Sequence, residues 1–325
     1  MLNAAIIGLG WWGKNLLNAV QDKSERIRFV HGVSKEPDAV RDLARRHGFR
    51  LSTDLEEALA DPQVQAVVLA TPHSLHADQI VRVAAAKKPV FCEKPLSLTR
   101  ADAERAVAAI KRAGVPLGVG QNKRFWPSTR ELIKVVRSGV LGKLLHIEGH
   151  YSNENSSKHF SAWRADPKET PGAGMTGTGI HLLDVFSALA GPAREVTAQF
   201  VTTKPSPDPL DTVSALFKFH NGMSGTLGAV RATPIYWRVH VFGDEGNAEA
   251  LGETELVLRL RGKQAESSRY EPLDSIRAEL EAFADAATGR APYPITPEEM
   301  VITVTTFEGV INAIARDGAV TLPPP

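Results

Sequence analysis

The chain has 325 residues, a net charge of +1 and an ordinary content of hydrophobic (43%) and charged (23%) side chains. This length allows two domains with separate cores, and the near-neutral charge argues against nucleic acid or an anionic membrane as a partner. A single cysteine, Cys92, excludes an intrachain disulfide and suits a reducing compartment. The N-terminal residues lead directly into a short apolar strand, so we expect no signal peptide. No segment of the sequence approaches the length of a membrane span, and we expect a cytoplasmic location.

Short apolar strands alternate with amphipathic helices over the first 120 residues. The expected strands are 4–8, 27–34, 64–72, 89–95 and 116–121, and the expected helices are 11–23, 37–48, 54–62, 74–88 and 99–114. Continuous apolar strands separated by helices are typical of a parallel, doubly wound α/β sheet. We therefore predict a nucleotide-binding Rossmann domain over residues 1–120.

The pattern changes in residues 121–325, for which we predict a second α/β domain. Apolar and polar residues alternate in the segments 144–151, 195–204, 211–220, 223–233, 237–243 and 255–262. Asn221-Gly222 lies between two of these segments and predicts a hairpin. The alternation indicates a mainly antiparallel sheet with one covered face, and two helices follow at 275–289 and 297–318.

The stretch GLGWWG connects the first strand to the first helix. Gly8, Gly10 and Gly13 have the spacing that lets the backbone turn sharply and approach a pyrophosphate at a helix N-terminus. Because the motif starts a βαβ unit, it favours a dinucleotide site over a tight turn without a ligand. The cofactor contacts expected here are Gly8, Leu9, Gly10, Trp11, Trp12 and Gly13.

The end of the second strand carries Ser34 and Lys35 where many nucleotide-binding chains have a carboxylate. A carboxylate accepts hydrogen bonds from the adenosine ribose and repels a 2′-phosphate. A serine hydroxyl can donate to that phosphate, and a lysine can neutralise part of its charge. We therefore favour NADP(H) over NAD(H); the alternative is that Lys35 is only a solvated lysine.

A second cluster, Glu93-Lys94-Pro95, lies at the carboxyl end of a buried strand, where ligands bind in open α/β sheets. Lys94 would emerge beside the cofactor, able to bond a substrate hydroxyl. Pro95 allows a cis peptide bond at this point. Taken alone, the tripeptide also fits a surface lysine in a loop.

The segments ATPHSLHADQIV, AAAKKPVFCEKPLSLT and GQNKRFWPS, with LGKLLHIEGHY, SAWRADP and PGAGMTGTGIHLLDVFSALAGP, resemble the Gfo/Idh/MocA oxidoreductase family. The resemblance extends over essentially the whole chain. It implies a Rossmann domain, a C-terminal α/β domain with a large open sheet, a nicotinamide cofactor, and a homodimer or homotetramer formed through that sheet.

The resemblance also implies the catalytic residues. The family's lysine corresponds to Lys94, and its histidine corresponds to His181 in GTGIHLLD. A histidine at a helix N-terminus tends to stay neutral and able to accept a proton. Asp184, one turn later, is a candidate to orient this ring or bind substrate. Polyol-oxidising relatives commonly carry an aspartate four residues before the histidine, where this chain has Gly177.

Further positions take weaker roles from the resemblance. For the cofactor they are Thr71, Pro72, His73, His76, Glu93, Lys94, Trp163 and Arg164. For the substrate they are Arg124, Asn155, Thr178, Tyr236 and Asp184, with His76 also fitting a structural role.

We therefore expect reversible hydride transfer between nicotinamide and a carbinol or carbonyl carbon of a sugar, cyclitol or related polyol. Two alternatives stay open: a redox-neutral enzyme that holds its cofactor tightly, and a non-catalytic NADP-binding sensor. The sequence shows no metal-ligand spacing and no G-x-S-x-G nucleophile motif.

Overall fold

The computed structural model describes residues 1–154, 162–202, 211–231 and 233–324. The chain divides into two compact units, Met1–Asn122 with Asp274–Pro297, and Lys123–Leu273 with Glu298–Pro325. Residues 274–297, which a boundary after residue 120 assigns to the second domain, therefore belong to the first unit.

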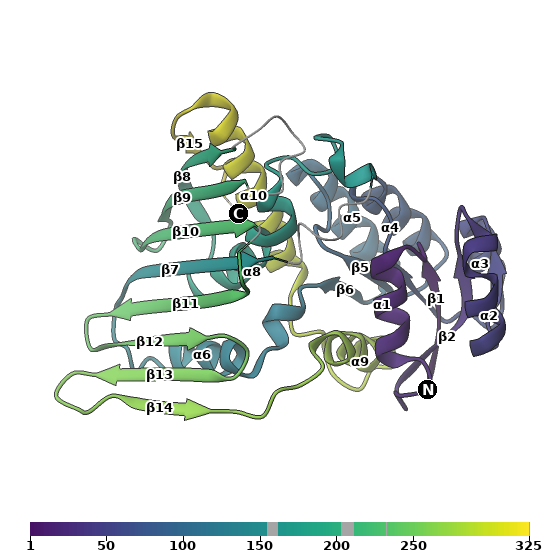
Figure 1. Ribbon diagram of the computed structural model, residues 1–325, viewed down its shortest axis with the longest axis horizontal. Helices are drawn as coiled ribbons and strands as arrows, with labels where there is room; N and C mark the ends of the chain where they lie inside the picture. Colours follow the sequence, from purple (N-terminus) through teal and green to yellow (C-terminus); the bar gives the residue numbers. More distant parts are fainter. Residues whose placement is uncertain (155–161, 203–210, 232, 325) are drawn as a thin grey trace. The chain divides into compact units, whose positions relative to one another are not determined.

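The first unit contains a six-stranded parallel sheet in the order β3-β2-β1-β4-β5-β6 (Figure 1), which confirms the predicted Rossmann-type fold. Its strands are β1 (Leu2–Ile7), β2 (Ile27–Val33), β3 (Arg50–Ser52), β4 (Ala66–Leu69), β5 (Val90–Glu93) and β6 (Leu117–Gly120). Its α-helices are α1 (Trp11–Val20), α2 (Arg41–His47), α3 (Leu55–Ala60), α4 (His76–Ala85), α5 (Arg100–Ala113) and α9 (Ser275–Ala287). The short strand β3 was not predicted.

Local sequence explains where these elements begin and end. The Thr99 hydroxyl accepts a hydrogen bond from the Asp102 amide and caps α5, and Gly114 ends the helix in a left-handed conformation. Every residue of β4 and β5 is buried, as the continuous apolar runs predict.

Helix α9 joins the first unit because its apolar face packs on that unit's sheet. The ring of Phe283 lies 5.7 Å from that of Phe91 in β5. The Tyr293 hydroxyl donates to the carbonyl of Val119 in β6 at 2.8 Å, and Arg277 Nε donates to the carbonyl of Ala19 in α1 at 2.9 Å. These contacts connect residues that are far apart in the chain, so local patterns did not reveal them.

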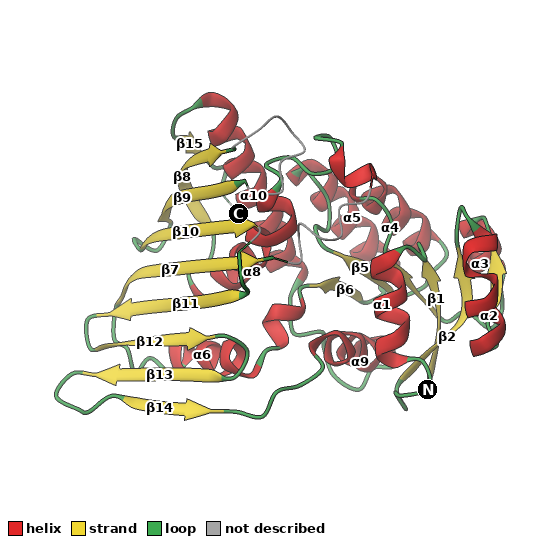
Figure 2. Ribbon diagram, in the orientation of Figure 1, coloured by secondary structure: helices red, strands yellow, loops and turns green. Residues whose placement is uncertain are grey.

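The second unit contains a nine-stranded sheet in the order β14-β13-β12-β11-β7-β10-β9-β8-β15 (Figure 2). Its strands are β7 (Leu144–Asn153), β8 (Ala193–Val201), β9 (Thr212–Phe219), β10 (Ser224–Arg231), β11 (Tyr236–Gly243), β12 (Gly246–Leu251), β13 (Glu255–Leu260), β14 (Glu266–Arg269) and β15 (Val320–Thr321). All neighbours pair antiparallel except β7 and β10. The large, mainly antiparallel sheet is thus confirmed, as is the hairpin at Asn221-Gly222, where Gly222 has a φ of +88°.

Helices cover one face of this sheet. α6 (Pro127–Arg137) packs against β12 and β13, and α8 (Ile180–Leu189) packs against β7. The long helix α10 (Pro297–Arg316) precedes β15. We call the opposite face, formed by the alternate residues that point away from α6 and α8, the outer face.

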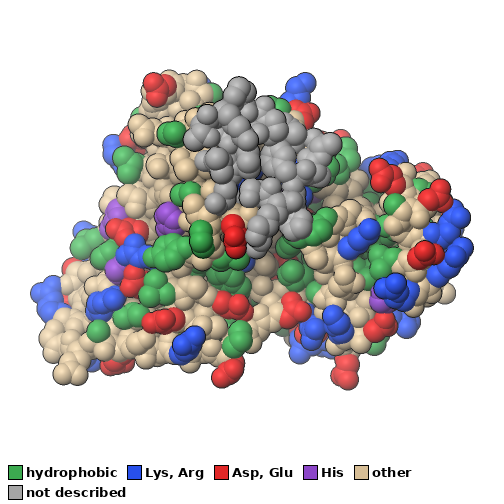
Figure 3. All heavy atoms as spheres, viewed as in Figure 1, with side chains coloured by type: hydrophobic (Ala, Val, Ile, Leu, Met, Phe, Trp, Pro, Cys, Tyr) green, Lys and Arg blue, Asp and Glu red, His purple; other side chains and the backbone are tan. Residues whose placement is uncertain are grey.

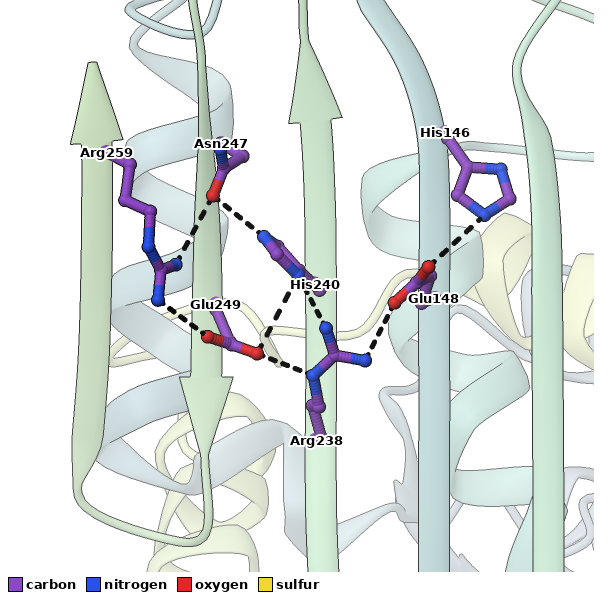
Figure 4. Close-up of polar contacts among 7 residues, drawn as sticks. All are labelled: His146, Glu148, Arg238, His240, Asn247, Glu249 and Arg259. Atoms are coloured by element: carbon purple, nitrogen blue, oxygen red, sulfur yellow. Dashed lines mark hydrogen bonds and ion pairs between the residues drawn. The ribbon is translucent and has the colours of Figure 1, made fainter.

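The outer face carries a continuous polar network across four strands (Figure 4). Arg238 at its centre donates to Glu249 at 2.5 Å, to Glu148 at 2.7 Å and to His240 Nδ1 at 2.7 Å. The remaining members are His146, Asn247 and Arg259. Figure 3 shows histidine, basic and acidic side chains gathered over this sheet.

Candidate functional site

The loop between β1 and α1 is shaped to let a ligand approach the backbone. Gly8 has a φ of +94°, and a Cβ there would lie 2.5 Å from the carbonyl oxygen of Ala70. A Cβ on Gly13 would lie 1.9 Å from the carbonyl oxygen of Gly8, so close packing requires glycine at both positions. A Cβ on Gly10 would meet no atom within 4 Å. Gly10 therefore presents open backbone at the N-terminus of α1, where a pyrophosphate fits.

The two tryptophans of this motif have different surroundings. Trp11 is 47% exposed, whereas the indole Nε1 of Trp12 is buried and has no hydrogen-bond partner within the described ranges. Their ring centroids lie 5.4 Å apart. A buried indole N–H can only donate, so Trp12 offers a donor beside the glycine loop. The open Gly10 backbone at the start of α1 fits a dinucleotide phosphate group.

Ser34 directly follows β2 at the same edge of the sheet. Its Oγ accepts a hydrogen bond from the Glu36 amide at 3.2 Å, which leaves the hydroxyl proton available for donation. The ammonium of the exposed Lys35 lies 3.4 Å from the carbonyl oxygen of Thr53. Arg41 pairs with Asp38 in an exposed ion pair.

A buried polar chain, missed in the sequence, fixes the strands beneath Ser34. His31 in β2 bonds Asp61 through Nδ1 and the Ser52 hydroxyl through Nε2, each at 2.9 Å. The Ser52 carbonyl in turn accepts from the Ser34 amide at 3.0 Å. The Gln63 amide and then His31 hold the pKa of Asp61 below its ordinary value. A histidine at the centre of an apolar strand was the available signal for such a chain.

The end of β5 places Lys94 at the same edge. The Lys94 amide donates to the buried Glu93 carboxylate at 3.2 Å, and the Lys94–Pro95 peptide bond is cis, as Pro95 allowed. The carboxylate occupies space next to Gly120, where a Cβ would lie 2.5 Å from Glu93 Oε1. Gly10, Ser34 and Lys94 thus all lie at the carboxyl ends of parallel strands, where α/β sheets bind ligands.

The loop after β4 carries four residues expected along the cofactor. Thr71 donates to Gln79 at 2.6 Å, Pro72 precedes a short helical turn, and His73 is 8% exposed. His76, expected at the cofactor, is fully buried, and both its ring nitrogens contact backbone carbonyls. Its ring therefore lies inside the protein, which agrees with the structural role considered for it.

In the second unit, His181 follows an irregular helical turn. Residues Met175–Gly179 form a π-helical segment that runs into α8, and such segments are frequent at functional sites. His181 is 6% exposed, and its ring lies 6.1 Å from that of Tyr151 in an edge-on arrangement. Burial raises the pKa of Tyr151 to about 12, so its hydroxyl stays protonated.

The residues before His181 define the space beside it. A Cβ on the exposed Gly177 would meet no atom within 4 Å, so the position could carry a larger side chain. The Thr176 hydroxyl bonds the Pro171 carbonyl and is therefore engaged. Thr178 is fully buried, and its hydroxyl has no hydrogen-bond partner among residues 1–154, 162–202, 211–231 and 233–324.

Arg124 and Asp184 bind each other instead of presenting two separate polar groups. Arg124, in the turn Asn122–Phe125, donates to both oxygens of Asp184 and also contacts Glu299 at 3.4 Å. Burial alone would lower the pKa of Arg124, but the carboxylates of Asp184 and Glu299 raise it above its ordinary value. Arg124 and Asp184 therefore form a buried ion pair, and their substrate roles stay predictions.

Four further candidates remain. Tyr236 begins β11 on the outer face, because the next residue, Trp237, contacts Tyr151 on the covered face. It therefore lies on the opposite side of the sheet from His181, and its substrate role stays a prediction. Trp163 and Arg164 stack on each other at 4.6 Å within the turn Ala162–Ala165. Asn155 lies outside the described residues.

Among the residues that the structure describes, no cluster of histidine, cysteine, aspartate and glutamate is arranged to hold a metal ion. In the same part of the chain, no helix has the length and apolar character of a membrane span.

A six-stranded parallel sheet with an open glycine loop after its first strand is typical of dinucleotide-binding Rossmann domains. Residues 2–121 match the model of an oxidoreductase family with an NAD-binding Rossmann fold, and residues 129–249 match that of the Gfo/Idh/MocA C-terminal domain. The chain belongs to the Gfo/Idh/MocA oxidoreductase family, which includes sugar and cyclitol dehydrogenases.

Three of the similar proteins align with this chain along nearly their whole length. The rhizopine catabolism protein MocA of Rhizobium meliloti is 30% identical over 326 residues, covering 96% of this chain and 95% of that protein. Myo-inositol 2-dehydrogenase of Thermotoga maritima is 27% identical, with 92% of both chains covered. The structure of GenD2 from gentamicin A biosynthesis in complex with NAD has a TM-score of 0.85 at 26% identity, covering 99% of this chain and 97% of that one.

Proposed function

We propose that this enzyme transfers hydride between the nicotinamide of NADP(H) or NAD(H) and a carbinol or carbonyl carbon of a sugar, cyclitol or related polyol, with NADP(H) preferred. The observation that carries the proposal is the shared sheet edge that holds the open Gly10 backbone, Ser34 and Lys94. The similarity of this chain to myo-inositol 2-dehydrogenase and levoglucosan dehydrogenase supports the proposed class of substrate.

The residues of the proposed site supply the proton transfer, the charge stabilisation and the binding contacts that the cofactor does not provide. The bound nicotinamide accepts or delivers the hydride. The Lys94 ammonium binds the substrate oxygen and stabilises negative charge that develops on it. His181 removes the hydroxyl proton during oxidation and returns it during reduction. Trp12 and the amides at the start of α1 hold the phosphates, with Thr71, Pro72 and His73 along the cofactor.

The NADP(H) preference is supported by the chemistry of the β2 end. Ser34 keeps a proton to donate, and Lys35 brings a positive charge to the same turn. A 2′-phosphate would use both, whereas a ribose hydroxyl would gain little from a lysine. Charge-assisted hydrogen bonds contribute about 1.5–3 kcal/mol, or roughly 10- to 100-fold in affinity.

The experiment is a fluorescence titration of cofactor-free protein with NADPH and NADH at equal salt. We expect NADPH to bind more tightly than NADH. Lys35→Ala should weaken NADPH binding, and Ser34→Asp should reverse the preference between the two cofactors. Lys23→Ala is the matched control, because the Lys23 ammonium also contacts a backbone carbonyl, that of Asn18, but follows α1 at the opposite edge of the sheet. Tighter NADH binding would remove the NADP(H) preference, and binding of neither would remove the enzymatic proposal.

We also propose that the chain forms a homodimer or homotetramer through the outer face. Val201, Leu216 and Tyr236 are exposed there by 58%, 61% and 47%, on the same face of the sheet as the Arg238 network. Exposed apolar side chains next to paired charges suit a self-complementary contact. Light scattering should give a dimer or tetramer that Leu216→Glu dissociates, and a monomeric wild type would contradict this proposal.

A further inference from the structure

The imidazole of His76 joins two loops at the ligand-binding edge of the first unit. His76 is the first residue of α4 and has no exposed surface. Its Nδ1 lies 2.7 Å from the carbonyl oxygen of Pro95, and its Nε2 lies 3.0 Å from the carbonyl oxygen of Thr71. These carbonyls belong to the loops that follow β5 and β4, which are neighbouring strands of the sheet.

The chemistry of the two contacts determines what the ring can be. A carbonyl oxygen only accepts hydrogen bonds, and a neutral imidazole has one N–H and one lone pair. In either neutral tautomer, one ring nitrogen would face a carbonyl oxygen lone pair to lone pair inside the protein. An imidazolium donates to both oxygens and satisfies both contacts.

The contact with Pro95 bears directly on Lys94. The Lys94 amide is held by the Glu93 carboxylate on one side, and the carbonyl of the next residue is held by His76 on the other. The Thr71 end is also anchored, because Thr71 donates to Gln79 one turn along α4. The backbone that carries the lysine is thereby fixed to the neighbouring loop by one ring.

We propose that His76 is held as an imidazolium that donates to the Pro95 and Thr71 carbonyls, and that this pair of hydrogen bonds positions Lys94. The positioning part rests on the proposed function of Lys94. His76 is a positioning residue, since its buried ring meets backbone carbonyls. The titratable groups on the surrounding elements are His73, whose ring centroid lies 5.7 Å away, Asp78 in α4, and Glu93 and Lys94 at the end of β5.

The first experiment measures the protonation of His76 directly in the wild-type protein. In ¹⁵N-histidine-labelled protein, long-range ¹H–¹⁵N spectra distinguish imidazolium from each neutral tautomer. At pH 8, well above the ordinary histidine pKa of about 6.5, we expect one of the ten histidines to keep both ring protons, and His76→Gln to remove that signal. If every histidine is neutral at pH 8, the imidazolium is disproved, and this result requires no variant.

The second experiment tests positioning through the contrast between binding and turnover. His76→Gln should leave the NADPH dissociation constant unchanged but lower kcat by about 10²-fold, the scale expected for a misplaced catalytic group. His47→Gln is the matched control, because His47 in the same unit bonds the Asp22 carboxylate at 2.8 Å away from this loop. An unchanged kcat would overturn the positioning role, whereas failure of the wild type to bind any cofactor would overturn the proposed function and leave the ¹⁵N result intact.

Discussion

The Arg124 guanidinium holds the Asp184 carboxylate through two parallel contacts, Nε to Oδ2 at 2.8 Å and Nη2 to Oδ1 at 3.1 Å. Both side chains are at most 4% exposed. This bidentate arrangement ties the turn at Asn122–Phe125 to α8, the helix that carries His181. The pair therefore supports the position of the helix that carries the proposed catalytic histidine.

Replacing one partner of this pair should strongly destabilise the protein. Asp184→Asn removes the bidentate carboxylate and leaves the buried Arg124 charge with only the longer Glu299 contact, which should lower the free energy of unfolding by about 3–5 kcal/mol. Urea denaturation measures the change. Asp38→Asn is the control, since it breaks an exposed pair with Arg41 and should cost about 0–1 kcal/mol. If both variants lose the same free energy of unfolding, the buried pair stabilises the protein no more than the exposed pair does.

Loss of the proposed catalytic groups should separate turnover from cofactor affinity. Lys94→Ala should abolish turnover, and His181→Asn should lower kcat by about 10²–10⁴-fold, the usual contribution of a general base. NADPH affinity should be retained in both variants, because neither change alters the glycine loop. Lys87→Ala, an exposed lysine close before β5, serves as the control. Full activity without Lys94 would exclude it as a catalytic residue.

Gly177 offers a gain-of-function test of substrate choice. An aspartate fits at this position because a Cβ there would meet no atom within 4 Å and the backbone does not require glycine. Gly177→Asp should raise kcat/KM for inositol- or glucose-type polyols by adding an acceptor for a substrate hydroxyl, by about tenfold for a hydrogen bond to a charged group. Gly177→Asn keeps the size without the charge. If neither variant changes the ratio of kcat/KM values between different polyol substrates, position 177 does not select the substrate.

The outer-face network should weaken as pH falls. Arg238 donates to His240 Nδ1, so the ring proton lies on Nε2, which donates to Asn247 at 2.8 Å. Burial holds the pKa of His240 below its ordinary value, so below about pH 6.5 the unfolded chain binds a proton here more readily than the folded chain does.

The free energy of unfolding should therefore decrease as pH drops from about 6.5 toward the lowered value. Urea denaturation across this range measures the slope, and His240→Gln should reduce it. His220→Gln, which changes an exposed histidine of the same unit, should leave it as it is. An identical slope in wild type and His240→Gln would show that His240 is not responsible.

The features that the sequence predicted well depend on a few consecutive residues. The glycine spacing at Gly8–Gly13 and the Lys94–Pro95 bond are local backbone properties, and both appear in the structure as expected. Arg124 and Asp184 are 60 positions apart, so no local pattern reveals that they meet. The outer-face position of Tyr236 was predictable in principle, because strand alternation places its side chain on the same face as those of Arg238 and His240.

The return of residues 274–297 to the first unit means that the two folds interleave along the chain. The order is first unit, second unit, first unit, second unit. A nascent chain that has emerged from the ribosome as far as residue 122 already has every strand of the parallel sheet but lacks Phe283 and Tyr293, which complete its core. The second unit is likewise incomplete until α10 and β15 have been synthesised. The first unit is complete only when synthesis reaches residue 297, the second requires the segment after it, and neither can be excised as one continuous fragment.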